Sequence, residues 1–471
     1  MNEDGRPYHQ NEEALNGLVK RFEAMVAGGS SAFFDVEELE DLIGFYLEQR
    51  EVRRAEMVLK YAAEVYPGHL AFKLKKAQIL ANNGKHVKAV PILKELLDVE
   101  PTNDEIHVTL GSIYSQMQEH KLAIRHFRKA LEYGDSDLRR DMHIEVALEY
   151  ENLGDWHQAI HYLKAALEED ATNETAVYEL AFCFDQTGAY TAAADYYRQF
   201  LDAQPYSFAA WYSLGNALQS NGRYPEAIEA YDFAIAIEDS FGPAYLQKAD
   251  ALSSMERFGD ALSVYQESLE YEPASANTIC YMGECFERMG DLEAAEKFYR
   301  ESLDLDPQFS DAYIGLGVLA DLRGDFTTAR LYFEQALDLD PGNQDYLLML
   351  GASMKKIGEH DQAEALFAQS LANHPRFQEM WLERVDNWQV QEEHEAALEC
   401  IAEAKKHVKR DVHLRIREVI SLYELKRDAA AFQVLEQLLI SHYDETETLI
   451  SLCPALANDA RFLERYDRFK P

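Results

Sequence analysis

The sequence predicts an all-α protein, a solenoid in which antiparallel helix pairs stack one on the next. Three observations predict this fold: an alanine that recurs every 34 residues, apolar residues at three- and four-residue spacing on both sides of a central glycine, and prolines that close many of the periods. A single 34-residue helix pair cannot bury its apolar faces, whereas a stack of pairs can. The alanines are Ala55, Ala89, Ala123, Ala159, Ala193, Ala227, Ala261, Ala295, Ala329, Ala363 and Ala397.

One step is 36 residues long, between Ala123 and Ala159, and we place the extra residues in a connecting loop at Gly134-Asp135-Ser136. A large apolar residue follows four positions after each alanine, on the same helical face. The central glycine is expected to end the first helix in a left-handed conformation, and the proline to end the second. The glycines are Gly84, Gly154, Gly188, Gly222, Gly290, Gly324 and Gly358, and the prolines are Pro67, Pro101, Pro205, Pro273, Pro307, Pro341 and Pro375.

The order of an aromatic slot, Leu-Gly, a central glycine, the alanine, an aromatic residue and a closing proline resembles the tetratricopeptide repeat family. The pattern is well developed at Trp211, Leu214-Gly215, Gly222, Ala227 and Tyr231. The resemblance implies a right-handed superhelical α-solenoid with helical caps at both ends. Eleven units are expected over residues 36–410, beginning near Val36, Leu70, Asp104, Arg140, Glu174, Phe208, Gly242, Ala276, Ser310, Gln344 and Gln378.

The ends are expected to cap the stack, because terminal repeats of a solenoid need a polar outer face. Residues 1–35 are predicted to form an N-terminal capping helix, at 11–27, and a loop. Residues 411–443 form a degenerate twelfth repeat, which keeps the apolar spacing but has Arg417-Glu418 where Leu-Gly belongs. Residues 444–471 are predicted to form two short closing helices.

The charge and the cysteines limit the class of protein. The chain has 84 Asp and Glu against 45 Lys and Arg, a net charge of −39, which disfavours binding to nucleic acid or to an anionic membrane surface. The start has no basic segment followed by an apolar core, and no run of eighteen apolar residues occurs, so neither a signal peptide nor membrane insertion is expected. Five cysteines form a sparse, odd set. We therefore predict a cytoplasmic protein.

The motifs that could carry chemistry are each explained better by the repeat. Gly315-Leu-Gly317-Val-Leu-Ala320 matches a dinucleotide fingerprint, but it lies inside a predicted helix and not after a strand. His157 and His161 share a helical face without a third ligand at a known spacing. Cys280 and Cys285 are too far apart for a Cys-x-x-Cys site. We predict no catalytic residue, no cofactor and no metal, hence no enzyme.

The resemblance implies that the first helix of each unit lines a concave groove that holds a peptide or a partner domain. One slot of this helix is apolar in ten successive units, which indicates either an apolar floor or a position half-buried between helices. These residues are Leu74, Val108, Ile144, Tyr178, Tyr212, Leu246, Cys280, Ile314, Leu348 and Leu382. Residues 208–275 carry 11 acidic and 3 basic side chains, a net −8, which favours a basic or amphipathic partner segment.

The main binding surface is predicted on units four to eight, where aromatic anchors and acidic side chains occur together. Its residues are Tyr178, Phe182, Tyr212, Asn216, Leu246, Asp250, Glu284 and Arg288. Two variants of the family are not supported: Asp250 and Glu284 would repel the terminal carboxylate that a co-chaperone clamp binds, and no asparagine ladder follows the groove.

The sequence leaves three hypotheses for function. The first is a non-catalytic scaffold or adaptor that binds a protein partner. The second is a structural subunit of a larger assembly, or a solenoid that associates with itself. The third is a regulatory module of a separately encoded enzyme.

Overall fold

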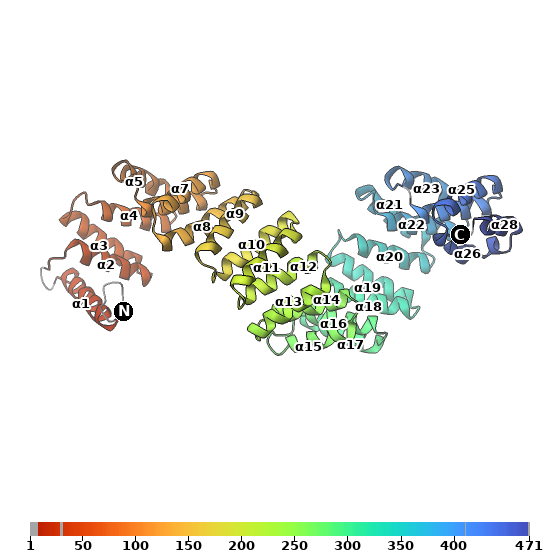
Figure 1. The fold of residues 1–471 in the computed structure, drawn as a ribbon, viewed down its shortest axis with the longest axis horizontal. Coiled ribbons are helices and arrows are strands. Elements are labelled where there is room, and N and C mark those ends of the chain that lie inside the picture. Colours follow the sequence, from red (N-terminus) through yellow and green to blue (C-terminus); the bar gives the residue numbers. More distant parts are fainter. Residues whose placement is uncertain (1–7, 29–31, 410, 470–471) are drawn as a thin grey trace. The chain divides into compact units, whose positions relative to one another are not determined.

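The computed structural model describes residues 8–28, 32–409 and 411–469; parts of the predicted caps and of the eleventh repeat, at 1–7, 29–31, 410 and 470–471, lie outside the described residues. Within the described ranges there are 28 α-helices, one 3-10 turn and no strand. The chain divides into two compact units, Met1–Asp239 and Ser240–Pro471. Each unit is a succession of antiparallel helix pairs, each packed on the next (Figure 1). The predicted all-α solenoid of helix pairs is confirmed.

The first unit contains α1 to α13. Their bounds are α1 Tyr8–Val26, α2 Val36–Glu48, α3 Val52–Val65, α4 Leu70–Asn82, α5 His86–Val99, α6 Asp104–Gln116, α7 His120–Tyr133, α8 Ser136–Asn152, α9 Trp156–Glu169, α10 Glu174–Thr187, α11 Tyr190–Ala203, α12 Phe208–Ser220 and α13 Tyr224–Ile237.

The second unit contains α14 to α28. Their bounds are α14 Gly242–Ser254, α15 Phe258–Ser268, α16 Ala276–Arg288, α17 Leu292–Leu305, α18 Ser310–Leu322, α19 Phe326–Leu339, α20 Gln344–Lys356, α21 His360–Asn373, α22 Gln378–Val390, α23 His394–His407, α24 Val412–Glu424, α25 Asp428–Ser441, η1 Asp444–Thr446, α26 Glu447–Leu452, α27 Pro454–Ala457 and α28 Ala460–Arg468.

The 36-residue step is absorbed differently from the prediction. We expected a longer loop and a repeat beginning near Arg140, but α8 begins at Ser136 and is 17 residues long, where most first helices have 13. Asp135 starts the helix early, because its side chain accepts a hydrogen bond of 2.9 Å from the backbone N–H of Leu138. The insertion therefore lengthens a helix, and only Gly134 and Asp135 connect α7 to α8.

The two helices of a pair are held close by small residues. All eleven predicted alanines are buried, as is Ala431 at the corresponding position of the degenerate twelfth repeat. Five first helices carry a glycine in contact with the large residue four positions after the alanine. A Cβ atom on Gly215 would lie 2.3 Å from the Tyr231 ring, and one on Gly351 would lie 2.2 Å from Phe367. The other three pairs are Gly111 with Phe127, Gly283 with Tyr299 and Gly317 with Phe333.

The turn between the two helices contains one residue in the left-handed conformation in each of the twelve repeats. All seven predicted glycines have positive φ, between 62° and 85°. The five repeats without a central glycine adopt the same conformation with a residue that has a side chain. These are Arg50 (φ 57°), Gln118 (59°), Glu256 (59°), Glu392 (61°) and Lys426 (57°). Backbone geometry is thus conserved across all twelve repeats even where glycine is not.

Direct contacts that skip a helix join first helices, as in α4 with α6 and α10 with α12 in the first unit. The pairs α16–α18, α20–α22 and α22–α24 repeat this arrangement in the second unit. Neighbouring first helices therefore contact one another directly, and they form the side on which the sequence predicted the binding groove.

Replacing Ala227 by Leu should destabilise the protein by about 1–3 kcal/mol, because the added atoms must fit between two packed helices. Ala227 is fully buried. Thermal unfolding followed by circular dichroism measures the change. The control is Ala192→Leu on the exposed face of α11, which should leave the melting temperature nearly unchanged. Equal melting of both variants would show that the alanine position does not limit helix approach.

Replacing Glu256 by Gly should stabilise the protein by roughly 0.5–1 kcal/mol, because a side chain is costly in the left-handed region and glycine is not. Glu256 is exposed and sits at φ 59°. The matched control is Ser254→Gly at the end of α14, where glycine should destabilise a right-handed helix. Chemical denaturation gives both values, and a loss of stability in Glu256→Gly would contradict the argument.

Candidate functional site

The apolar slot predicted to line the groove is mostly half-buried. Leu74 and Cys280 are buried, and the other eight residues of the slot are partly exposed. The slot is therefore half-buried in most units, and an apolar floor for a ligand stays a prediction.

In the first unit, the predicted residues Tyr178, Phe182, Tyr212 and Asn216 form what we call the aromatic surface, on α10 and α12. The rings of Tyr178 and Tyr212 meet edge to face, with centroids 6.4 Å apart. Phe182 is 46% exposed and meets the ring of Trp156 edge to face at 5.8 Å. Such edge-to-face pairs fix the ring orientations, so this surface is preorganised.

Asn216 has a structural partner. The hydroxyl of Tyr231, which comes from the second helix α13, donates a hydrogen bond of 2.9 Å to Asn216 Oδ1. The Tyr231 ring centroid lies 6.0 Å from that of Tyr212. Burial raises the pKa of Tyr178 to about 12, so its hydroxyl stays protonated at neutral pH. The aromatic surface thus offers rings and a phenol donor on a rigid base.

In the second unit, four carboxylates form what we call the acidic surface: Asp250 on α14, Glu284 and Glu287 on α16, and Asp311 on α18. Burial raises the pKa of Glu284, and the neighbouring charges of Asp250 and Asp311 raise it further, while Arg288 opposes them. Burial also raises the pKa of Glu287, which accepts a hydrogen bond of 2.6 Å from the hydroxyl of Tyr299. These negative groups are close enough to repel one another.

The sequence placed Asp250, Glu284, Arg288 and Leu246 in this region but missed Asp311. Asp311 is the second residue of α18 and lies outside the slots that the repeat comparison followed. Its carboxylate accepts a hydrogen bond from the hydroxyl of Tyr346 in the next repeat. Arg288 points its guanidinium over the Phe258 ring, 5.3 Å from the centroid.

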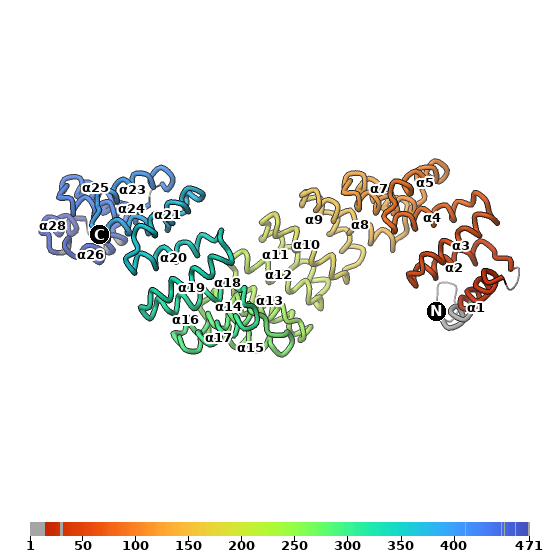
Figure 2. Tube along the Cα trace, turned by 180° about the vertical axis from the view of Figure 1, so that it is seen from behind, coloured from red at the N-terminus to blue at the C-terminus, as the bar shows by residue number. Residues whose placement is uncertain are grey.

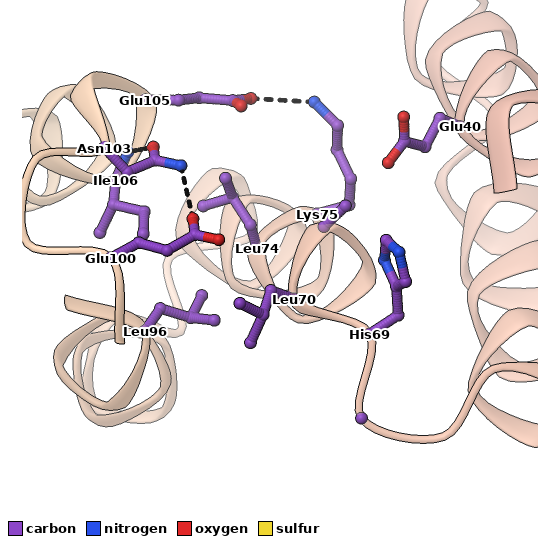
Figure 3. Close-up of a pocket in the computed structure, with 12 residues that line it drawn as sticks. Glu40, His69, Leu70, Leu74, Lys75, Leu96, Glu100, Asn103, Glu105 and Ile106 are labelled. Atoms are coloured by element: carbon purple, nitrogen blue, oxygen red, sulfur yellow. Dashed lines mark hydrogen bonds and ion pairs between the residues drawn. The ribbon is translucent and has the colours of Figure 1, made fainter. Parts of the chain in front are cut away.

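The first unit also has a cavity of about 480 Å³ that the sequence did not predict (Figure 3). Leu70, Leu74, Leu96 and Ile106 form its apolar floor. Its rim is polar, with an ion pair of 2.9 Å between Lys75 and Glu105 and a hydrogen bond of 2.8 Å from Asn103 to Glu100. Glu40 and His69 complete the lining. The combination suits an apolar side chain of a ligand that carries polar neighbours.

The models of one known family match the stretches of the chain that contain these repeats. Models described as "Tetratricopeptide repeat" match residues 46–106, 104–133, 145–208, 208–241, 246–308, 282–344 and 322–383. The chain belongs to the tetratricopeptide repeat family. This membership supports a scaffold for protein–protein interaction.

Similar proteins of known name or structure share this repeat. Cell division cycle protein 27 homolog A of Arabidopsis thaliana is 38% identical over 64 residues, which are 14% of this chain and 9% of that protein. The crystal structure of the APC/C hetero-tetramer Cut9-Hcn1 has a TM-score of 0.43 at 14% identity, covering 84% of this chain and 96% of the other. A tetratricopeptide repeat protein from Parabacteroides merdae ATCC 43184 has a TM-score of 0.41 at 17% identity, covering 52% and 98%.

The residues weighed for other chemistry have structural positions in the repeat. Gly317 lies against Phe333 inside α18, so the glycine pattern there serves helix packing. His157 and His161 are exposed on α9. Cys280 is buried, which raises the pKa of its thiol to about 12. Among the described residues, no three His, Cys, Asp or Glu side chains are placed to hold a metal, and no helix there is long and apolar enough to cross a membrane.

A histidine pair joins α6 to α7. The Nδ1 atoms of His107 and His126 lie 3.0 Å apart, and Nε2 of His107 lies 3.2 Å from the carbonyl oxygen of Pro101. One consistent arrangement has His107 Nε2–H donating to Pro101 and His126 Nδ1–H donating to His107. Burial lowers the pKa of His126 to about 4, and the charges of His107, Arg125 and Lys94 contribute. Both rings are therefore neutral at pH 7.

Acidification should weaken the fold through this pair. The ordinary pKa of His126 is 6.5 and its folded value is about 4, so the unfolded state binds the proton first and stability is lost as the pH falls from about 7 to 4. In His126→Asn this loss is removed. The melting temperature of the wild type minus that of the variant should therefore decrease between pH 7.5 and pH 4.5. A constant difference would show that His126 titrates normally in the folded protein.

Proposed function

We propose that this chain is a non-catalytic scaffold or adaptor whose first helices bind a basic or amphipathic segment of a partner protein. The acidic surface carries the proposal. Asp250, Glu284, Glu287 and Asp311 repel one another in the absence of a ligand, and a partly buried position strengthens that repulsion. A Lys or Arg side chain of a partner would relieve it.

We infer the charge of the ligand from the charged groups around Glu284. Arg288 is the cation that lowers the pKa of Glu284, and two neighbouring carboxylates raise it. Electrostatic complementarity of this kind speeds association and selects against acidic partners.

The aromatic surface supplies the apolar part of recognition. The partly exposed Tyr178 and the exposed Phe182 offer contact area to a partner. Their side chains already contact Tyr212 and Trp156, so they lose little conformational entropy on binding. Aromatic residues are enriched among those that dominate interface energies. Each surface is argued within its own unit: apolar residues of a partner would contact the rings, and basic residues of a partner would contact the carboxylates. The five free, buried cysteines support a reducing compartment, and we propose a cytoplasmic location.

Two pairs of substitutions test the proposal on a partner captured from native extract with the wild-type chain. Tyr178→Ala with Phe182→Ala should accelerate dissociation, because contact area is lost. Asp250→Lys with Glu284→Lys should slow association at least about tenfold and reduce its salt dependence. Surface plasmon resonance at several salt concentrations measures both rates, and circular dichroism checks that helicity is retained.

The control reverses two charges away from the first helices. Glu293 and Glu301 lie exposed on the second helix α17, and Glu293→Lys with Glu301→Lys changes the net charge by the same amount. This control should associate at nearly the wild-type rate. If it slows association as much as Asp250→Lys with Glu284→Lys, net charge and not the acidic surface governs binding. Unchanged kinetics in both test variants would exclude these surfaces as the binding site.

A further inference from the structure

A cluster of basic side chains lies on the exposed face of α7, in a strongly acidic protein. Lys121, Arg125 and Arg128 stand at spacings of four and three residues, so they share one face over two turns of the helix. All three are exposed, and the side chain of Lys129 is 44% exposed beside them. Together with Ile124 and Glu132 they line a surface hollow of about 370 Å³. We call this the α7 hollow.

The cations of the α7 hollow are only partly neutralised. Lys129 pairs with Glu132 at 2.6 Å. Among the residues that the structure describes, no carboxylate lies within ion-pair distance of Lys121, Arg125 or Arg128. Arg128 is oriented by the hydroxyl of Tyr162 on α9, a neutral group. Three positive charges therefore face solvent without a counter-charge.

The charge of the surrounding sequence is also exceptional. Residues 50–133 contain 14 Lys and Arg against 10 Asp and Glu, a net +4, while the rest of the chain carries −43. The charges of Arg125 and of Lys94 on α5 both lower the pKa of His126. In both views α5, α7 and α9 lie along one edge of the first unit (Figure 2).

A second hollow shows that the charge, and not the shape, is special. In the second unit, Glu293, Glu296, Lys297, Arg300, Glu301 and Asp304 line a hollow of about 540 Å³ on α17. These six residues occupy the same repeat positions as Lys121, Ile124, Arg125, Arg128, Lys129 and Glu132. The α17 hollow has four carboxylates and two cations, whereas the α7 hollow has four cations and one carboxylate. A hollow at these repeat positions thus occurs on two second helices, and the side chains that line it have opposite net charge in the two cases.

We propose that the α7 hollow is a docking site for an acidic segment of a partner protein, one whose carboxylates recur at helical spacing. Three cations over two turns of α7 span about 10 Å, given a rise of 1.5 Å per residue. Carboxylates three and four residues apart on a partner helix repeat over the same length. A lone phosphate group would reach only part of this row. The site is separate from the first-helix surfaces and does not depend on the function proposed for them.

Other polyanions fit the molecule less well. Nucleic acid and an anionic membrane extend far beyond the α7 hollow, so they would meet the −43 carried by the rest of the chain. A short segment is different, because charges more than a Debye length away, about 8 Å at physiological salt, are screened.

A second copy of this chain, docked through its α17 hollow, also fits poorly. In antiparallel register Arg125 would face Arg300 and Arg128 would face Lys297. In parallel register Arg125 would face Lys297 and Arg128 would face Arg300. With Glu132 included, three like-charged pairs meet in either direction, against two opposite-charged pairs.

A synthetic peptide tests the site on the full chain. The probe is a fluorescein-labelled, alanine-rich helical peptide with glutamates four and three residues apart on one face, and the reference peptide has glutamine at the same positions. At low salt the wild type should bind the glutamate peptide at least about tenfold more tightly than the glutamine peptide, as judged by anisotropy. This preference should decrease as salt is added. Equal binding of the two peptides would overturn the proposal.

Variants locate the binding. Lys121→Glu with Arg125→Glu should abolish the preference, and Lys121→Gln with Arg125→Gln should reduce it with less risk to folding. The matched control, Lys297→Glu with Arg300→Glu on α17, changes the net charge equally and should keep the preference. Loss of the preference in the control, or its survival in both α7 variants, would overturn the proposal.

The remaining occupants are tested in parallel. A DNA duplex, phosphatidylserine vesicles, and light scattering for self-association are each measured with the wild type and the α7 variants. Dependence of one of these on Lys121 and Arg125, without a peptide preference, would replace the acidic segment by that occupant. The α7 variants should leave binding of a basic partner to the acidic surface unchanged. The proposal for the α7 hollow and the proposal for the acidic surface can therefore be tested separately.

Discussion

The close approach of two helices within each repeat is the constraint on which the rest of the structure depends. It requires a buried alanine on the second helix. In five repeats it also requires a glycine on the first helix, because an aromatic ring packs directly against the glycine backbone. A Cβ atom on Gly215 would come within 2.3 Å of Tyr231. Because this contact recurs with the same geometry, each pair presents the same face to the next pair, and stacking needs no further specification. The exposed faces are then free to vary in chemistry, as the hollows of α7 and α17 do.

Packing and recognition also share residues. Tyr231 fills the space beside Gly215, and its hydroxyl reaches Asn216 on the first helix. Tyr299 lies against Gly283 and donates to Glu287 of the acidic surface in the same way. The aromatic residue that the helix pair needs for packing therefore also orients a polar side chain on the first helix. A tyrosine at this position couples the two roles, whereas the phenylalanines at Phe333 and Phe367 serve packing alone.

Sequence reasoning could find what depends on local periodicity. Ten of the eleven first helices begin at the residue that the 34-residue register indicated, from Val36 to Gln378. The exception is α8, because a two-residue insertion can lengthen either a helix or a loop, and only the cap at Asp135 decides between them. Glycine spacing also predicted the left-handed turns but not those at Arg50 or Lys426, where the backbone of the repeat overrides the preference of the residue.

The candidate surfaces were less predictable, since they depend on contacts between repeats. The register placed Tyr178 and Tyr212 at one slot, and their rings do meet. It could not show that Asn216 accepts a hydrogen bond from Tyr231, that Asp311 acts on Glu284, or that no described carboxylate pairs with Lys121 or Arg125. Elsewhere cations commonly bridge adjacent repeats, as in Arg198 to Glu226 and Arg417 to Asp386. Each such pair contributes little free energy, yet it uses a cation that is scarce in a chain of charge −39. Among the residues that the structure describes, no carboxylate forms such a bridge with Lys121 or Arg125, so their charges are available to the acidic segment that we propose.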